Sequence, residues 1–247
     1  MTHRLIRHDT ICELRLERTP VNALTPDFMF ALRDTLRDIE QDDTVRAILI
    51  TSAVKVTSAG LDLRVVADFD SAGQRAVVEG LDSLFTTLFA CPKPTVIAAH
   101  GAAIAGGLFF VLASDWRVGG PQARFGLAEV RVGATFPTGP MEIARDQLAP
   151  ADLRRLMLRG QPYDAATALG AGIIDEISET PETAALVRAQ ELAELPPKTY
   201  AAIKAQSRAP ALSRIEQRLS ELREAPPRDY FSDETRAAMT AMLEKQP

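Results

Sequence analysis

The segment Gly101-Ala102-Ala103-Ile104-Ala105-Gly106-Gly107 is the most informative part of the chain for its architecture. Before it, Thr95-Val96-Ile97-Ala98-Ala99 is rich in β-branched residues and predicts a buried strand. After it, Leu108-Phe109-Phe110-Val111-Leu112-Ala113 predicts an apolar helix. The small residues between them therefore indicate a tight strand-to-helix turn, in which glycine allows conformations and close approaches that other residues resist.

A second segment of this kind is Ser58-Ala59-Gly60-Leu61-Asp62-Leu63-Arg64, which follows another predicted buried strand, Val45-Arg46-Ala47-Ile48-Leu49-Ile50-Thr51. A helix start leaves backbone N–H groups without partners, and the helix dipole favours negative charge there. If the two turns meet in space, their N–H groups can form an oxyanion hole. If they do not meet, each is an ordinary strand-to-helix turn. The spacing alone is consistent with both interpretations.

The other patterns predict strands and helices in alternation, followed by helices. Ile11–Leu16 alternates with period two, which is typical of a half-buried strand, and Thr25 is suited to cap a helix. From Gly139 onward apolar residues recur at helical spacing, and Ser232 is suited to cap a final helix. Gly172–Ile177 is either a last short strand or the edge of a turn. The chain is therefore predicted to be α/β.

Length and composition are those of an ordinary globular protein. The 247 residues are 46% hydrophobic and 25% charged, which is enough for a sizeable buried core. We expect an α/β core over residues 1–195 and a helical C-terminal region over residues 196–247.

Charge and composition argue against several classes of function. A net charge of −5 does not favour a nucleic-acid binder, and no apolar run is long enough to cross a membrane. Two cysteines, Cys12 and Cys91, cannot frame a disulfide scaffold, and His3, His8 and His100 lack metal-ligand spacing. The N-terminus lacks the apolar core of a secretory signal. We therefore expect a cytoplasmic protein with no metal site.

Two partial motifs are explained without special chemistry. Asp68–Glu79 nearly matches a calcium-binding loop, but Ala72 stands where a carboxylate ligand belongs. The glycines of the 101–107 segment have phosphate-loop spacing, but Gly107 and Leu108 replace the lysine and hydroxyl residue of that motif.

The order of several segments resembles the crotonase (enoyl-CoA hydratase/isomerase) superfamily over nearly the whole chain. The segments that carry the resemblance are Thr19–Leu24, Val45–Leu49, Ser58–Leu63, Lys93–Gly101 and Ala105–Gly107. The resemblance implies a crotonase-like spiral of ββα units with a helical C-terminal region that mediates trimers. It also implies binding of an acyl-CoA thioester and stabilisation of its enolate, with the backbone N–H groups of Leu61 and Gly106 as the two oxyanion donors.

The carboxylates distinguish the reactions of this family. Its hydratases use two glutamates, and alignment on Gly106-Gly107 puts Phe109 in the place of the first. The second corresponds to Glu129, which the resemblance implies as the catalytic base; the alternative is a solvated charge beside Arg131. A single carboxylate and an oxyanion hole suit the transfer of a proton within one substrate. The segments around Ser58 and Glu129 are also more similar to Δ3,Δ2-enoyl-CoA isomerases than to hydratases.

The expected reaction is therefore a shift of the double bond of a 3-enoyl-CoA to the 2-trans position. Other family reactions stay open as alternatives: thioester hydrolysis, decarboxylation or hydration. A different class of function, a non-catalytic acyl-CoA-binding or scaffold protein, also stays open. The resemblance further implies a homotrimer or hexamer, and no cofactor beyond the coenzyme A that the substrate carries.

Substrate-binding candidates come from the same segments. Because coenzyme A carries phosphates, Arg64 is the best-placed cation and Lys204 a weaker one, although an ordinary solvated cation explains each equally well. The remaining substrate-binding candidates are Ser58, Gly60, Asp62 and Phe109.

Overall fold

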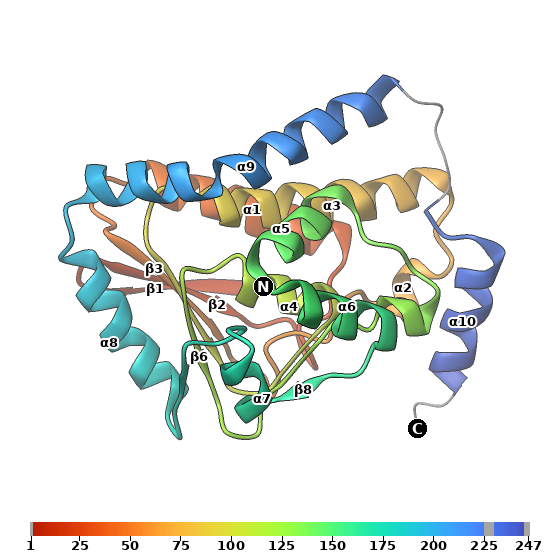
Figure 1. Ribbon diagram of the computed structural model, residues 1–247, viewed down its shortest axis with the longest axis horizontal. Helices are drawn as coiled ribbons and strands as arrows, with labels where there is room; N and C mark the ends of the chain where they lie inside the picture. The colour runs from red at the N-terminus through yellow and green to blue at the C-terminus, as the bar shows by residue number, and fades with distance from the viewer. Residues whose placement is uncertain (1, 225–229, 245–247) are drawn as a thin grey trace.

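Two β-sheets and a set of covering helices form the body of the protein (Figure 1). The computed structural model describes residues 2–224 and 230–244. The larger sheet contains, in spatial order, β1 (His3–His8), β2 (Ile11–Leu16), β3 (Ala47–Ser52), β4 (Thr95–Ala99), β6 (Trp116–Gly119) and β9 (Glu176–Ile177). The smaller sheet contains β5 (Ala102–Ile104), β7 (Arg124–Gly126) and β8 (Tyr163–Asp164).

Helices connect and cover these strands. Those of the first half are α1 (Pro26–Gln41), α2 (Leu63–Val66), α3 (Ser71–Ala90) and α4 (Leu108–Leu112), with the 3₁₀ turns η1 (Ala105–Gly107) and η2 (Glu129–Val132). Those of the second half are α5 (Thr138–Gln147), α6 (Pro150–Arg159), α7 (Ala165–Gly170), α8 (Pro181–Ala193), α9 (Pro197–Glu224) and α10 (Asp233–Glu244). The result is an α/β architecture, as predicted.

The larger sheet is buried on both faces at its central strands, while its edge strand β1 is partly exposed. Its strands from β2 to β9 are parallel, and helices cross between them, so neither face is left to water. In β3, Ile48 and Ile50 face the main core, while Ala47 and Leu49 face a second cluster that α8 covers. Successive side chains of a strand point to opposite faces, so both sets must be apolar.

Burial on both faces corrects the prediction for Ile11–Leu16. The strand is there, but it is buried on both sides instead of one. Glu13 lies among its buried residues because three polar groups contact its carboxylate: Thr51 donates to it at 2.6 Å, and His8 and Arg15 lie at 2.6 and 3.2 Å. A buried charge is tolerated when it is paired in this way.

Other boundaries agree with the prediction closely. Strand Thr95–Ala99 is confirmed, and the strand predicted at 45–51 is β3. Helix α1 begins directly after Thr25, although the Thr25 side chain makes no capping hydrogen bond. Ser232 does cap α10, since its hydroxyl accepts from the backbone N–H of Thr235 at 3.1 Å. The sequence analysis missed β1, which pairs antiparallel with β2 across a short turn.

The C-terminal helices pack on the α/β part and share its hydrophobic core. Helix α9 contacts α3 and α5 and changes direction along its length in Figure 1, and Pro210 lies inside it. Ala211, Ile215 and Met239 belong to the same hydrophobic core as the sheet. The division at residue 195 and the expected trimer stay predictions.

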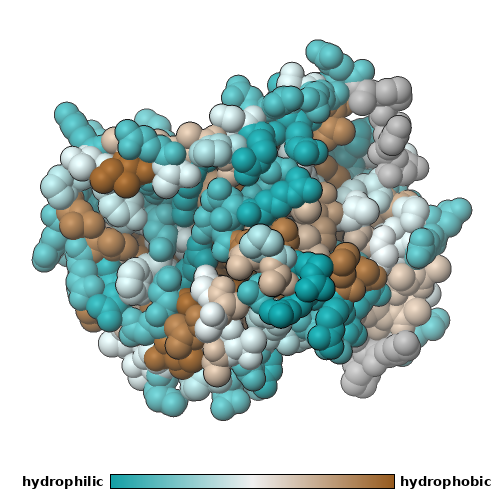
Figure 2. All heavy atoms as spheres, in the orientation of Figure 1, coloured by the Kyte–Doolittle hydropathy of each residue, from teal (hydrophilic) through white to brown (hydrophobic). Residues whose placement is uncertain are grey.

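The outer surface is largely hydrophilic on the face drawn in Figure 2, where apolar side chains gather in a few small groups. Large exposed apolar residues are scattered, among them Leu5 on β1, Leu158 on α6, and Ile203 and Leu222 at separate positions of α9. Of the helices in the described ranges, none has the length and hydropathy needed to span a membrane.

Candidate active site

The two glycine-rich turns meet in space. A Cβ atom added to Gly60 would lie 3.3 Å from the backbone nitrogen of Gly106, 2.9 Å from the Cβ of Ala105 and 3.0 Å from the carbonyl oxygen of Ile104. Only a residue without a side chain fits this approach. The residues after the two strands are therefore neighbours, which is the arrangement that an oxyanion hole requires.

The backbone N–H of Leu61 is left free by the pairing of its segment with Leu24. Leu24 donates to the carbonyl of Gly60 at 2.7 Å and accepts from the N–H of Asp62 at 2.9 Å. In a parallel pair these bonds go to the peptide groups on either side of Leu61, so its own N–H points away from Leu24. Leu61 lines the main cavity of the protein.

The N–H of Gly106 is free because it lies at the start of η1, before any intrahelical acceptor is available. Within the part of the chain that the structure describes, neither this N–H nor that of Leu61 has a hydrogen-bond partner. Each of them follows a residue with positive φ: Gly60 at +84° and Ala105 at +51°. Positive φ is unfavourable for alanine, and such strain is typical of backbone that is held in place for a function.

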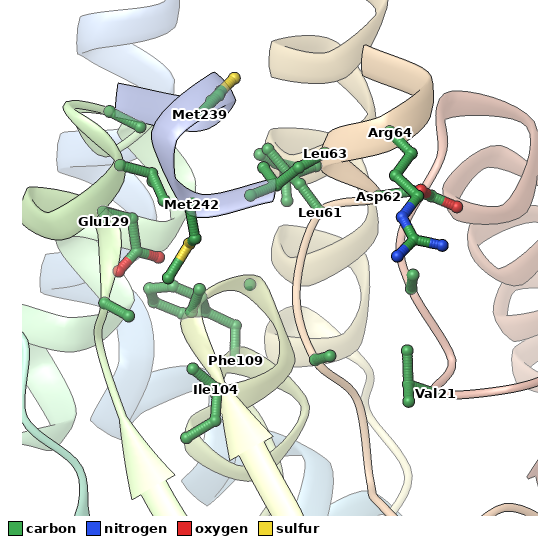
Figure 3. A pocket seen from close by; sticks show the side chains of 18 of the residues that line it. Val21, Leu61, Asp62, Leu63, Arg64, Ile104, Phe109, Glu129, Met239 and Met242 are labelled. Atoms are coloured by element: carbon green, nitrogen blue, oxygen red, sulfur yellow. The ribbon is translucent and has the colours of Figure 1, made fainter. Parts of the chain in front are cut away.

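A cavity of about 570 Å³ opens beside these two N–H groups (Figure 3). Asp62 and Arg64 lie toward one end of it, and Glu129 with Met239 and Met242 lies toward the other. Leu61, Leu63, Ile104 and Phe109 lie between them. The cavity therefore has a charged end and an apolar end with one carboxylate.

Glu129 is the carboxylate of the apolar end. It begins η2 and is only 8% exposed, and its Oε2 has no hydrogen-bond partner among the described residues. Burial raises the pKa of Glu129 to about 8. The group is therefore able to hold or release a proton near neutral pH. The alternative of a solvated charge beside Arg131 is wrong, because Glu129 is buried; Arg131 itself donates to the carbonyls of Gly160 and Arg159.

This buried carboxyl group predicts a pH-dependent stability. Its pKa is higher folded than unfolded, so the folded state binds the proton more tightly. The free energy of unfolding should fall as the pH rises from about 5 to 8, by about 1.4 kcal/mol per pH unit from this group. In Glu129→Gln this contribution is absent. Thermal denaturation of both proteins at pH 6 and pH 9 checks this; a Tm difference that is independent of pH would contradict it.

Phe109 lies on α4, 1% exposed, and lines the cavity. Its ring packs against Phe85 and Phe136, with centroids 5.5 and 6.4 Å away. The resemblance gives the position of Phe109 to the first of the two glutamates that hydratases use. The cavity lining includes only two carboxylates in the described chain, Asp62 and Glu129, and Asp62 is paired with Arg18 at 2.8 Å.

The other predicted substrate-binding residues divide into two groups. Arg64 lines the cavity and is exposed, and no described residue forms an ion pair with it. Ser58 and Gly60 support the turn instead of lining the cavity: the Ser58 hydroxyl donates to the carbonyl of Asn22 and accepts from the N–H of Gly60.

Lys204 is a correction. It is 7% exposed, lies 2.7 Å from Asp115, and donates to the carbonyl of Lys93 at 3.0 Å. It is outside the cavity lining, and its ammonium group joins α9 to the loops before β4 and β6, so it is not available to a substrate phosphate.

The sequence analysis missed the C-terminal part of the cavity. Tyr230, Met239, Met242 and Leu243 line it, and the Tyr230 hydroxyl donates to the carbonyl of Thr135. Helix α10 is tied to both sides of the cavity: Arg236 donates to the carbonyl of Ala67 and Thr235 to that of Gly133. Apolar spacing in 233–244 predicts the helix, but nothing local in it predicts which surface it covers. No cluster of three or more potential metal-ligating residues occurs in the described ranges.

The family model, a curated relative and solved structures all point to one family. The family model described as enoyl-CoA hydratase/isomerase matches residues 7–247. The probable enoyl-CoA hydratase EchA17 of Mycobacterium tuberculosis is 30% identical over 195 residues, which cover 78% of this chain and 74% of that protein.

Solved structures agree in fold. A probable enoyl-CoA hydratase from Mycobacterium tuberculosis, EchA3, superposes with a TM-score of 0.84 at 31% identity, covering 91% of this chain and 95% of that one. A second structure of that protein, described as an enoyl-CoA isomerase, gives a TM-score of 0.78 at 29% identity, covering 99% and 98%.

Proposed function

The chain belongs to the enoyl-CoA hydratase/isomerase family, and from that premise we propose that it is an isomerase, which moves the double bond of a 3-enoyl-CoA to the 2-trans position. The observation that carries the proposal is that the described lining of the cavity holds a single unpaired carboxylate. Glu129 is buried without a partner for Oε2, while Phe109 occupies the position of a second acid or base. One group that both removes and returns a proton is sufficient for isomerisation.

In the proposed reaction the thioester oxygen accepts hydrogen bonds from the N–H groups of Leu61 and Gly106. Ionised Glu129 removes a proton from C2. The electron pair of that C–H bond delocalises over the C3–C4 double bond and the thioester carbonyl, which gives a dienolate. The two N–H groups stabilise the negative charge on its oxygen. Glu129 then returns the proton to C4, the C2–C3 double bond forms, and the carboxylate is regenerated.

The environment of Glu129 supports this role. A proton shuttle works best when its pKa is near the working pH, and burial raises the pKa of Glu129 to about 8. The neighbouring Phe109 and Met242 side chains carry no group that could activate water. Hydration needs a water molecule and a second group that handles a proton, so this site favours isomerisation over hydration.

The charged end of the cavity suits the coenzyme A part of the substrate. Arg64 is exposed there without an ion-pair partner among the described residues, and the neighbouring Arg18 is held by Asp62. A cation in this position attracts phosphate groups. The acyl chain then extends past Glu129 toward the apolar end.

A direct assay tests the proposal. Purified protein mixed with a 3-enoyl-CoA should form the conjugated 2-enoyl thioester, detected by its ultraviolet absorbance. A parallel reaction with a 2-enoyl-CoA should show little loss of conjugation, since hydration would remove it. Tight binding of acyl-CoA without conjugation would refute the isomerase and leave hydrolysis, decarboxylation or simple binding.

A further inference from the structure

Asp82 is a buried carboxylate that the proposed reaction does not use. It lies on α3, is 6% exposed, and accepts a hydrogen bond from the backbone N–H of Gly139 at 2.6 Å. It forms no ion pair with any described lysine, arginine or histidine. Burial raises its pKa to about 6. Burial of a carboxylate without an ion-pair partner destabilises the folded state. The hydrogen bond that Asp82 makes with Gly139 is therefore expected to serve a purpose.

Gly139 lies in the first turn of α5, and the segment 136–140 around it forms part of the cavity wall. Phe136, Pro137 and Pro140 from this segment line the cavity. Asp82 binds it at the N-terminus of α5, where the helix dipole favours a negative charge. Asp82 therefore holds the backbone behind a wall whose other face is open to a ligand.

The fit at this point is tight. A Cβ atom on Gly139 would lie 2.8 Å from the Thr86 hydroxyl and 3.2 Å from Oδ1 of Asp82. The segment is thus pressed against α3, one turn of which presents both Asp82 and Thr86. Loss of the hydrogen bond would let the segment move, and Phe136 and Pro137 would move with it.

This wall lies beside Phe109 in the cavity. Phe136 packs against Phe109, and the segment shares the cavity with Met239 and Met242 of α10. The charged end, with Asp62 and Arg64, is on the other side (Figure 3). A substrate whose thioester meets Leu61 and Gly106 therefore directs the tail of its acyl chain toward Phe136–Pro140.

We propose that Asp82 is a positioning residue that fixes the wall for the acyl tail, so that the protein selects flexible aliphatic acyl chains long enough to reach Phe136–Pro140 over short ones. The inference rests on the proposed function for the direction of the substrate. It does not depend on which reaction the site performs, because it concerns binding.

Calorimetric binding of butyryl-CoA and decanoyl-CoA tests it. In the native protein decanoyl-CoA should bind more tightly. Asp82→Ala should weaken decanoyl-CoA binding about ten-fold and change butyryl-CoA binding less than about two-fold. Asp82→Asn keeps an oxygen acceptor for the N–H of Gly139 and should stay close to the native protein with both ligands. Equal weakening of both ligands by Asp82→Ala, or no weakening of either, would overturn the proposal.

A second variant covers the case in which Asp82→Ala does not fold. Gly139→Ala pushes the same segment away from α3 and should reproduce the selective loss of decanoyl-CoA binding. Thr86→Ala in that background removes the nearest clash and should restore part of the affinity. If neither change alters chain-length selectivity, contacts with α3 do not fix the position of the wall, and the proposal is wrong. Binding with normal selectivity but without isomerisation would instead contradict the proposed function alone.

Discussion

Replacing Glu129 with glutamine is expected to lower the turnover of a 3-enoyl-CoA about a thousand-fold, with little change in acyl-CoA affinity. Glutamine has nearly the same shape as glutamate but cannot accept a proton from C2. General base catalysis of this kind contributes about a hundred- to ten-thousand-fold. In the proposed reaction the substrate is held by the N–H groups of Leu61 and Gly106 and by the cavity wall, which the change leaves in place.

Steady-state kinetics and calorimetry on the same preparation separate these effects. kcat should fall, while the dissociation constant for a saturated acyl-CoA should change less than about three-fold. The native enzyme should also lose kcat/KM below pH about 8, since the free carboxyl group is then protonated. A Glu129→Gln variant that still turns over at the native rate would exclude Glu129 as the base.

Replacing Gly60 with alanine is expected to lower kcat by a similar factor through a different cause. The new methyl group would lie 2.9 Å from the Cβ of Ala105 and 3.3 Å from the nitrogen of Gly106, so the two N–H donors must move apart. Loss of one such donor costs about a hundred- to a thousand-fold in other enzymes. Displacement of both should reach the upper part of that range.

Gly172 provides a matched control for backbone strain. Its φ is +68°, close to the +84° of Gly60, but nothing lies within 4 Å of the position of an added Cβ. Gly172→Ala should therefore share the strain of positive φ, about 1 kcal/mol of stability, and leave kcat unchanged. Adding Ala105→Gly to Gly60→Ala should recover part of the activity. Full activity in Gly60→Ala would show that the meeting of the two turns is not needed for the reaction.

Those parts of the fold that depend on local patterns were predictable from the sequence. Strand Thr95–Ala99, the start of α1 after Thr25 and the cap of α10 at Ser232 all follow from residue type and spacing over a few positions. β1 was not predicted because this partly exposed edge strand shows no clear alternation of apolar residues. The two-sided burial of β2 depends on α8, which is more than 160 residues away in the chain.

In the candidate site, too, local features could be predicted from the sequence and long-range contacts could not. Small residues after two strands predicted where backbone N–H groups would be free, but not that the turns would meet. Lys204 was assigned wrongly because a lysine in a sequence does not reveal its partner, here Asp115 at 89 residues' distance. Asp82 was not noticed, since its partner is a main-chain N–H of a residue 57 positions later.

The two free N–H groups beside Gly60 belong to the main chain, and this affects how the protein can change. Substitution of Leu61 by any residue other than proline leaves its amide in place, so few mutations can delete that donor. The proposed base, in contrast, is the side chain of Glu129, and Phe109 beside it is also a side chain, so a single codon change can alter either position. Laboratory evolution toward a new reaction can therefore concentrate its libraries on these two positions and the α10 residues beside them, and leave the glycine-rich turns untouched.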